Sequence, residues 1–292
     1  MKLSSGFAGS TLKEYDCAVS TRWIMNYAAA IGDPNPRYFN DERQEGIVAP
    51  PMFPAAATWP ILENIADYIE AEAFPKEVLI TQVHYTEHLT IHQAVTPGSN
   101  LKIRGAIAAI LPHRAGSHVV IRFDATDAKG TPIFTEHIGA MMRGITCADR
   151  GKGGDRLPVV PHQEETSPPC WELMIPVDPL APFIYDGCTN IHFPIHTSVK
   201  FAHEVGLPGI ILQGTFTLAL AVHQILNTEA CGDPQRIHQV YCRFTDMVIP
   251  GSAIKIRLTG KSRALTGTNL FFTVLNAADK PAISDGYIRL KD

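Results

Sequence analysis

The chain has 292 residues, of which 45% are hydrophobic, and its formal net charge is −4. This length allows two domains, each with its own hydrophobic core, or one large fused domain. The slightly acidic balance offers no basic surface for DNA or RNA, so we expect no nucleic-acid partner.

The sequence predicts neither export nor a membrane anchor. Residues 1–10 lack the apolar run and the small-residue cleavage site of a secretory signal. The most apolar stretch, residues 207–226, is interrupted by polar side chains and predicts a buried helix rather than a membrane span. Six cysteines lie far apart without a Cys-x-x-Cys pair, which is typical of reduced thiols. We therefore expect a cytoplasmic protein.

The chain repeats itself at a period of about half its length. The segment that begins at Tyr27 aligns without a gap with the segment that begins at Tyr185, and residues 82–104 are echoed by 239–257. A repeat unit of this size predicts two copies of one fold, since a solenoid would need shorter units.

Residues 146–170 separate the two copies. Their density of glycine, proline and charge opposes packed secondary structure and predicts a linker along the surface. We therefore expect an N-terminal domain over residues 1–145 and a C-terminal domain over residues 171–292.

Each copy predicts the same order of elements. An opening helix with a tyrosine is followed by a proline-rich segment and then by a mostly apolar helix, which we expect over residues 55–73 and 214–230. Runs of β-branched and aromatic residues separated by turn signals then predict three strands in each copy: 101–110, 118–125 and 133–142, then 254–258, 270–276 and 283–290. The economical packing is an α+β fold with one buried helix against a curved antiparallel sheet.

The opening helix of the first copy leads into Gly32-Asp33-x-Asn35-Pro36. This motif, with the proline-rich entry to a buried helix and the sheet that follows, resembles the MaoC-like dehydratases, which include the (R)-specific enoyl-CoA hydratases (hydratase 2). The resemblance covers the whole chain as a double hot-dog fold. It implies hydration of an enoyl thioester, or dehydration of a 3-hydroxyacyl thioester, without a metal or an organic cofactor. It also implies coenzyme A or, less expectedly, an acyl carrier protein as thioester carrier, and a possible homodimer.

The family motif reads Gly-Asp-x-Asn-Pro-x-His, and its Asp and His flank the α and β carbons of the substrate. Adding water to a conjugated thioester needs one group that deprotonates water and another that delivers a proton to the α-carbon. The enolate that develops needs a fixed donor, which the family takes from a backbone N–H at the start of the buried helix. In this chain that position is near Gly214.

Both copies depart from the motif. The first keeps Asp33 but has Tyr38 where the histidine belongs, and the second keeps His196 but has Asn190 and Ile191 where Gly and Asp belong. Each copy thus holds half of the dyad.

Three explanations stay open. The second copy can be catalytic through His196 with His192 or Asn190 beside it, the first copy can work through Asp33 and Tyr38, or neither copy catalyses hydration. We favour His196 as acid or base, because histidine titrates near neutrality without a large environmental shift.

Other residues carry weaker predictions. Gln213, one residue before Gly214, either orients the thioester or only packs, and Asp33 either reacts or only braces a turn. The run His192-Phe193-Pro194 resembles a motif of the hydroxyacyl-carrier-protein dehydratases, but we find no partner acid for it near Gly214.

Histidines and basic residues on the strands complete the candidates. His84, His88 and His92 fall on a predicted strand, facing solvent, so we expect no metal there. Four basic residues could meet the phosphates of coenzyme A: Lys102, Arg104, Lys255 and Arg257. The alternatives to a hydratase are a degenerate hot-dog protein that binds an acyl thioester or a partner subunit, and an isomerase that works through an enolate.

Overall fold

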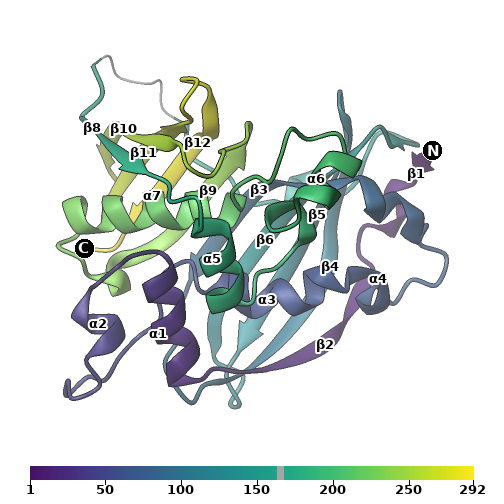
Figure 1. Cartoon of the computed structure of the whole chain (residues 1–292). Coiled ribbons are helices and arrows are strands. Elements are labelled where there is room, and N and C mark those ends of the chain that lie inside the picture. Colours follow the sequence, from purple (N-terminus) through teal and green to yellow (C-terminus); the bar gives the residue numbers. More distant parts are fainter. Residues whose placement is uncertain (163–167) are drawn as a thin grey trace.

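The structure is a computed structural model that describes residues 1–162 and 168–292. Most strands join one ten-stranded antiparallel sheet in the order β2-β4-β5-β6-β3-β9-β12-β11-β10-β8. The first five strands belong to the N-terminal copy and the last five to the C-terminal copy. The long helices lie on one face of this sheet (Figure 1). The predicted α+β architecture, with a buried helix against an antiparallel sheet in each copy, is confirmed, and the pairing of β3 with β9 joins the two sheets into one.

The N-terminal copy begins with short strand β1 and ends with β7, which pairs with it. Between them the chain forms β2, the opening helix α1, the short helix α2, the central helix α3 with its extension α4, and strands β3 to β6. The bounds are Lys2–Leu3 (β1), Thr11–Ala18 (β2), Thr21–Ala30 (α1), Pro36–Phe39 (α2), Pro54–Glu63 (α3), Ile65–Tyr68 (α4), Gln82–Ile91 (β3), Asn100–His113 (β4), Gly116–Thr126 (β5), Pro132–Arg143 (β6) and Thr146–Cys147 (β7).

The C-terminal copy repeats this order with one more short helix, α6, before its central helix α7. The bounds are Trp171–Pro176 (β8), Ala181–Thr189 (α5), Val199–Glu204 (α6), Gly214–Glu229 (α7), Ile237–Phe244 (β9), Ala253–Arg263 (β10), Thr268–Leu275 (β11) and Pro281–Leu290 (β12). Short 3-10 helices occupy Ser5–Phe7, Lys76–Thr81, Gly154–Arg156, Pro194–His196 and Pro234–Arg236.

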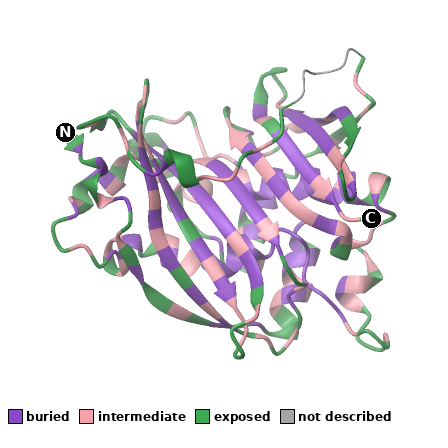
Figure 2. Ribbon diagram, turned by 180° about the vertical axis from the view of Figure 1, so that it is seen from behind, coloured by how far each residue is buried: buried purple, intermediate pink, exposed green. Residues whose placement is uncertain are grey.

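The two copies meet along strands β3 and β9, which pair antiparallel from Thr86 opposite Arg243 to Thr90 opposite Gln239. On the helical face, the tyrosines of the two opening helices meet. The hydroxyls of Tyr27 and Tyr185 lie 3.3 Å apart, and both side chains are fully buried. One hydrophobic cluster accordingly runs through both copies. Figure 2 shows how buried residues dominate the strands near this seam.

The central helix of the second copy matches its predicted bounds, but that of the first copy is shorter than predicted. The helix ends at Glu63, and a break at Asn64 precedes the single turn α4. Pro60 within α3 removes one helical hydrogen bond. Beyond Tyr68 the chain turns onto the sheet, because Ile69 pairs with Leu12.

The predicted solvent exposure of the β3 histidines was wrong. Val83 is exposed and His84 lies beside the buried Glu87, because the register of β3 against β6 shifts between His84 and Thr86 and a one-residue shift exchanges the faces of a strand. His88 points to the face opposite Leu89 and is buried there beside His137 and Tyr241 of the neighbouring strands. His92 alone of the three histidines is exposed.

The linker packs along the first copy. Lys152 exchanges two backbone hydrogen bonds with Ile110, and Asp149 accepts a bond from the backbone N–H of Ser5. Residues 163–167 of the predicted linker lie outside the described residues. Among the described residues, no helix is long and apolar enough to cross a membrane.

Candidate functional site

The segment after each opening helix crosses to the other copy. We call residues 31–40 the first overhang and residues 189–198 the second overhang. In the first, the side-chain amide of Asn35 donates to the carbonyl of Gly232, beyond the end of α7, at 2.6 Å. In the second, the carbonyl of His192 accepts from the indole N–H of Trp59 on α3 at 3.2 Å. Each overhang therefore lies against the central helix of the other copy.

The first overhang places Asp33 beside His223 of α7. Asp33 Oδ1 lies 3.5 Å from His223 Nε2, and the side chains are 2% and 6% exposed. The same Asp33 oxygen accepts from the backbone N–H of Asn35 at 3.1 Å, which fixes the carboxylate. An imidazole of the second copy thus lies beside the aspartate of the first motif, which has no histidine of its own.

The hydrogen bonds of His223 define its ring proton. The amide of Gln224 lies 3.4 Å from His223 Nδ1, and because an amide nitrogen only donates, Nδ1 accepts. The proton of the neutral ring therefore sits on Nε2, facing Asp33. Burial raises the pKa of Asp33 above its ordinary value, with His223 opposing the rise, and burial lowers the pKa of His223. The two groups are suited to share one proton.

Asp33 lines an open, polar hollow at the surface. We call this the Asp33 hollow, and its other lining residues are Pro34, Asn35, Pro36, Arg37, Arg43, Asn227, Cys231 and Gly232. It is built from the first overhang and from the end of α7, so both copies contribute to it.

Tyr38, the residue in place of the motif histidine, is fully buried against Ala28 and Val48. Its hydroxyl has no hydrogen-bond partner among the described residues. Burial raises the pKa of this phenol far above its ordinary value, so it stays protonated. Burial and the charge of Asp33 both disfavour a phenolate and outweigh Arg37, which weighs against the alternative in which Asp33 works with an acidified Tyr38.

The second overhang positions His196 beside the entry to α7. The Nδ1–H of His196 donates to the carbonyl of Ile211 at 2.8 Å, three residues before Gly214. Because a carbonyl only accepts, Nε2 carries the free lone pair. Burial lowers the pKa of His196 to about 4, so the ring is neutral at pH 7 and can act as a base.

The entry to α7 has the geometry of an anion site. Gln213 stands at the N-cap position without a side-chain capping bond, and the first N–H groups, from Gly214 onward, have no intrahelical acceptors. Gly214 lies so close to the ring of Phe244 that a Cβ would sit 3.1 Å from it. The Gln213 amide donates to the carbonyl of Pro182, while its buried oxygen has no hydrogen-bond partner among the described residues.

The remaining second-overhang candidates behave differently. Asn190 ends α5 in the left-handed conformation with φ 63° and is exposed, which is ordinary for a residue that ends a helix. Ile191, where the motif aspartate belongs, is buried in the core. His192 Nε2 lies 2.7 Å from Glu63 Oε1 of α3, with side chains 50% and 35% exposed. The acid beside His192 therefore lies on the central helix of the other copy, not near Gly214, where the sequence offered none.

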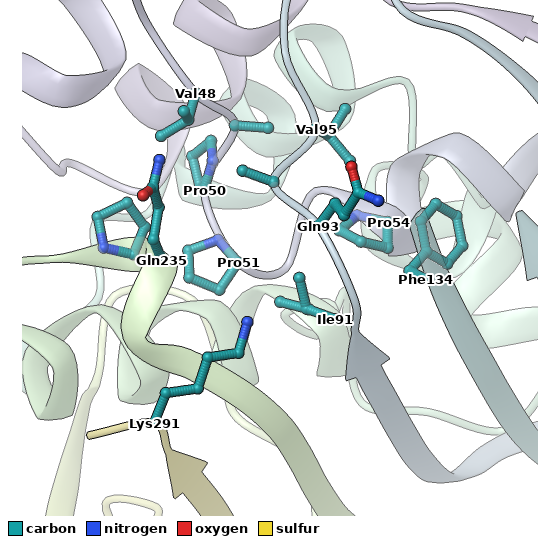
Figure 3. A pocket seen from close by; sticks show the side chains of 13 residues that line it. Val48, Pro50, Pro51, Pro54, Ile91, Gln93, Val95, Phe134, Gln235 and Lys291 are labelled. Atoms are coloured by element: carbon teal, nitrogen blue, oxygen red, sulfur yellow. The ribbon is translucent and has the colours of Figure 1, made fainter. Parts of the chain in front are cut away.

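A second hollow of about 310 Å³ lies at the entry to α3 (Figure 3). We call it the proline hollow. Its walls are mostly apolar, with Pro50, Pro51, Pro54, Ile91 and Phe134 among them, and the amine of Lys291 from the C-terminal copy reaches into it. It lies at the start of the central helix of the first copy, which is the position that corresponds to Gly214 in the second copy.

The four basic residues predicted to meet phosphates are neutralised within the chain. Glu14 pairs with Lys102 and Arg104, Asp279 pairs with Lys255, and Glu172 pairs with Arg257. Ion pairs at the surface do not forbid a ligand, but they remove the free charge that suggested one. Within the described part of the chain, no cluster of three or more His, Cys, Asp or Glu side chains has the arrangement of a metal site.

Comparison with known families agrees with this double arrangement. Residues 167–276 match the MaoC like domain, and residues 7–136 match the FAS1-like, dehydratase domain region. The chain thus matches a dehydratase domain model in each of its two copies, and neither model spans half of the chain.

Relatives match this MaoC-like chain over different shares of their length. The peroxisomal multifunctional enzyme type 2 of Drosophila melanogaster is 22% identical over the whole chain, which spans 48% of that enzyme. A fatty acid synthase beta subunit of Monascus ruber is 33% identical over 26% of the chain and 4% of the subunit. The chain therefore spans half or less of these relatives.

Among solved structures, the MaoC-like dehydratase of Phytophthora capsici superposes with a TM-score of 0.81 at 17% identity, covering 97% of this chain and 96% of the other. The likeness extends over both copies and shows the fold, a double hot dog.

Two polar residues of this MaoC-like chain were not predicted as site residues: His223 and Glu63. Both are the tenth residue of a central helix. The available signal was a histidine that interrupts the apolar helix after Gly214. Which overhang faces it is a matter of tertiary structure, which the sequence pattern does not contain.

Proposed function

We propose that this protein is a hydro-lyase that adds water to an enoyl thioester, or removes it from a 3-hydroxyacyl thioester, with His196 as the acid–base group. The observation that carries the proposal is the bond from His196 Nδ1 to the carbonyl of Ile211. It leaves the basic Nε2 atom free and holds the ring beside the entry to α7.

The proposed step uses both features. The Nε2 atom of His196 takes a proton from water, the water oxygen bonds to the β-carbon, and the electron pair of the C=C bond moves toward the thioester carbonyl. The N–H groups from Gly214 onward stabilise the negative charge on that oxygen. The protonated imidazole then returns one proton to the α-carbon. Neither a metal nor an organic cofactor takes part in this scheme.

Further parts of the proposal rest on the family. The carrier is coenzyme A rather than an acyl carrier protein, with Gln213 positioned to orient the thioester. A homodimer of the double unit is a reasonable state. Six free cysteines support a reducing, cytoplasmic setting.

A specific observation favours a second candidate function. Ile191 is buried where the motif aspartate would stand, so the second overhang lacks an acid of its own. A thioester-binding protein without turnover has no need for that acid.

The test is turnover of short, branched and aromatic enoyl-CoA thioesters, followed by mass, in the wild type and in His196→Gln. We expect a loss of at least tenfold in kcat, since general acid–base catalysis contributes roughly 10²- to 10⁴-fold. His203→Gln is the matched control, because this histidine also contacts a backbone carbonyl, that of Pro208, after the same overhang. Binding without turnover in the wild type would replace the hydratase with the binding protein.

The pH profile gives an independent reading. A base whose pKa is lowered to about 4 stays unprotonated through neutral pH. We expect kcat/KM to hold from pH 8 toward pH 5 and to fall only as the pH approaches 4. An acid limb centred near 6.5 would assign the base to a group other than His196.

A further inference from the structure

We propose that Asp33 is a second acid–base centre, positioned by His223, which moves a proton on and off the α-carbon of an acyl thioester that carries an anionic group. The thioester class rests on the proposed function, but the centre is separate from His196. It is assembled from both copies and opens into the Asp33 hollow.

The first step of the argument is the pairing itself. Asp33 is one of the few charged side chains buried to 2% exposure, and burial of a carboxylate is costly unless it is paired and hydrogen-bonded. It has both kinds of partner: the His223 ring at 3.5 Å and the backbone N–H of Asn35 at 3.1 Å. If Asp33 only stabilised the turn, its hydrogen bond with the N–H of Asn35 would be sufficient and the contact with His223 would be unnecessary.

The second step is access. Asp33 lines the hollow, whereas His223 lies behind it within α7 and does not line it. A ligand in the hollow therefore meets the carboxylate first. His223 acts through Asp33 and is a positioning residue.

The third step concerns the charge of the ligand. Two guanidinium groups, those of Arg37 and Arg43, line the same hollow. Each has one acidic neighbour: Asp233 lies 3.6 Å from Arg37, and Glu45 lies 3.1 Å from Arg43. The contact between Arg37 and Asp233 is longer than a hydrogen bond, and the buried Nε of Arg43 has no hydrogen-bond partner among the described residues, so donors of both groups remain unused. Planar guanidinium groups suit carboxylates and phosphates.

The chemistry is a balanced enolisation. The Asp33 carboxylate takes the α-proton, the C–H electron pair becomes a C=C bond, and the carbonyl π pair moves onto the thioester oxygen. In reverse, the same carboxyl group returns a proton to the α-carbon. Nothing is oxidised or reduced, and in D2O each cycle can replace one C–H bond with one C–D bond.

The experiment measures deuterium uptake at the α-carbon of saturated thioesters in D2O by mass, which does not depend on hydration. Four variants of the full chain are compared: Asp33→Asn, His223→Gln, Arg43→Gln and His196→Gln. We expect exchange of a succinyl thioester to fall at least tenfold in Asp33→Asn and to persist in His196→Gln. Exchange that persists in Asp33→Asn, or that no thioester shows in the wild type, would overturn the proposal.

The pH dependence separates positioning from mere support of the fold. His223 holds down the pKa of Asp33, so its loss should raise that pKa and move the acid limb of the exchange rate to higher pH. A lower rate with an unmoved limb would overturn the positioning role. His88→Gln is the matched control, because His88 is an equally buried histidine that packs near His137 and Tyr241 instead of an overhang.

A comparison of substrates shows whether the anionic group lies on the acyl end or on the thioester carrier. Succinyl and butyryl groups are offered on coenzyme A and on N-acetylcysteamine, which lacks phosphates. A KM raised by Arg43→Gln for both succinyl thioesters assigns the anion to the acyl end, and a KM raised for both coenzyme A thioesters assigns it to the carrier. An unchanged KM for all four would overturn the anionic ligand. If His196→Gln loses hydration but keeps exchange, both the proposed hydration by His196 and the proposed exchange by Asp33 hold. If it keeps full hydration, the role of His196 in hydration is contradicted and the role of Asp33 in exchange is not affected.

Discussion

Tyr38 illustrates how a single buried atom decides between two interpretations. It occupies the position of the motif histidine, yet its side chain is enclosed with Ala28 and Val48 and its hydroxyl finds no partner among the described residues. A hydroxyl buried without a hydrogen bond costs stability rather than adding function.

We therefore expect Tyr38→Phe to leave turnover unchanged and to raise the free energy of unfolding by about 1 kcal/mol, because the change removes only the unsatisfied hydroxyl. Urea denaturation and the thioester assay on one preparation check both parts. A tenfold loss of turnover in a stable Tyr38→Phe protein would return the phenol to the reaction.

For single residues, the sequence predicted which side chains are candidate site residues but not which side chains they contact. It named both His196 and Gly214 as candidates, and the structure holds the His196 ring at the carbonyl of Ile211, three residues before Gly214. It could not pair Asp33 with His223, since they are 190 positions apart and no local pattern records the contact. Glu63 was not predicted as the partner of His192 for the same reason.

At the scale of elements, Asn35 joins the first overhang to the end of α7. Its Oδ1 accepts from the N–H of Arg37 and caps α2, and its Nδ2 donates to the carbonyl of Gly232. One side chain thus begins a helix in one copy and holds the other copy.

We expect Asn35→Ala to lower the free energy of unfolding by about 1–2 kcal/mol, because a helix cap and a hydrogen bond between the copies are both lost. Chemical denaturation measures this change. Asn40→Ala is the matched control, since Asn40 makes a similar bond to the N–H of Glu42 without reaching the other copy. Equal losses in the two variants would show that the bond between the copies adds nothing.

Prediction of the elements succeeded where the pattern was local. Strands β4 to β6 and β10 to β12 and helix α7 carry continuous apolar or β-branched signals, so their positions followed from the sequence, whereas β2, β8 and β9 were not predicted. Helix α3 was predicted too long because the residues after Tyr68 retain helical propensity, and the pairing of Ile69 with Leu12 overrides it. The burial of His84 and His88 was not predicted, because neither a β-bulge nor the side chains of neighbouring strands give a clear signal in one sequence.

For the whole molecule, buried ionisable groups set how stability varies with pH. Burial lowers the pKa of several histidines to about 4, so the unfolded chain binds more protons as pH falls below 6.5, and acid destabilises the fold. These histidines are His84, His88, His118, His137 and His196.

The buried carboxyls have the opposite effect. Burial raises the pKa of Glu87 to about 8, and burial together with the neighbouring Glu87 raises that of Glu136. The folded state then holds protons that the unfolded chain releases above about pH 4.5, so stability falls as pH rises toward 8. Greatest stability is therefore expected near pH 6.5, between the two limbs.

We expect Glu87→Gln to flatten the alkaline limb, making the free energies of unfolding at pH 6.5 and pH 8 more nearly equal than in the wild type. Chemical denaturation at the two pH values measures the difference. Glu14→Gln, which changes an exposed carboxylate, should leave the limb as it is. A wild-type stability that does not decline between pH 6.5 and pH 8 would contradict a protonated Glu87.

The crossing of the overhangs has a consequence for how this chain can evolve. In a homodimer of identical subunits, one mutation changes both symmetric positions at once, whereas a fused chain lets them diverge. The tenth residue of the two central helices shows such divergence: it is His223 opposite an acid in one case and Glu63 opposite an imidazole in the other. Acid and base have exchanged places between the two sites, so natural selection can retain one chemistry while the other is free to specialise or decay.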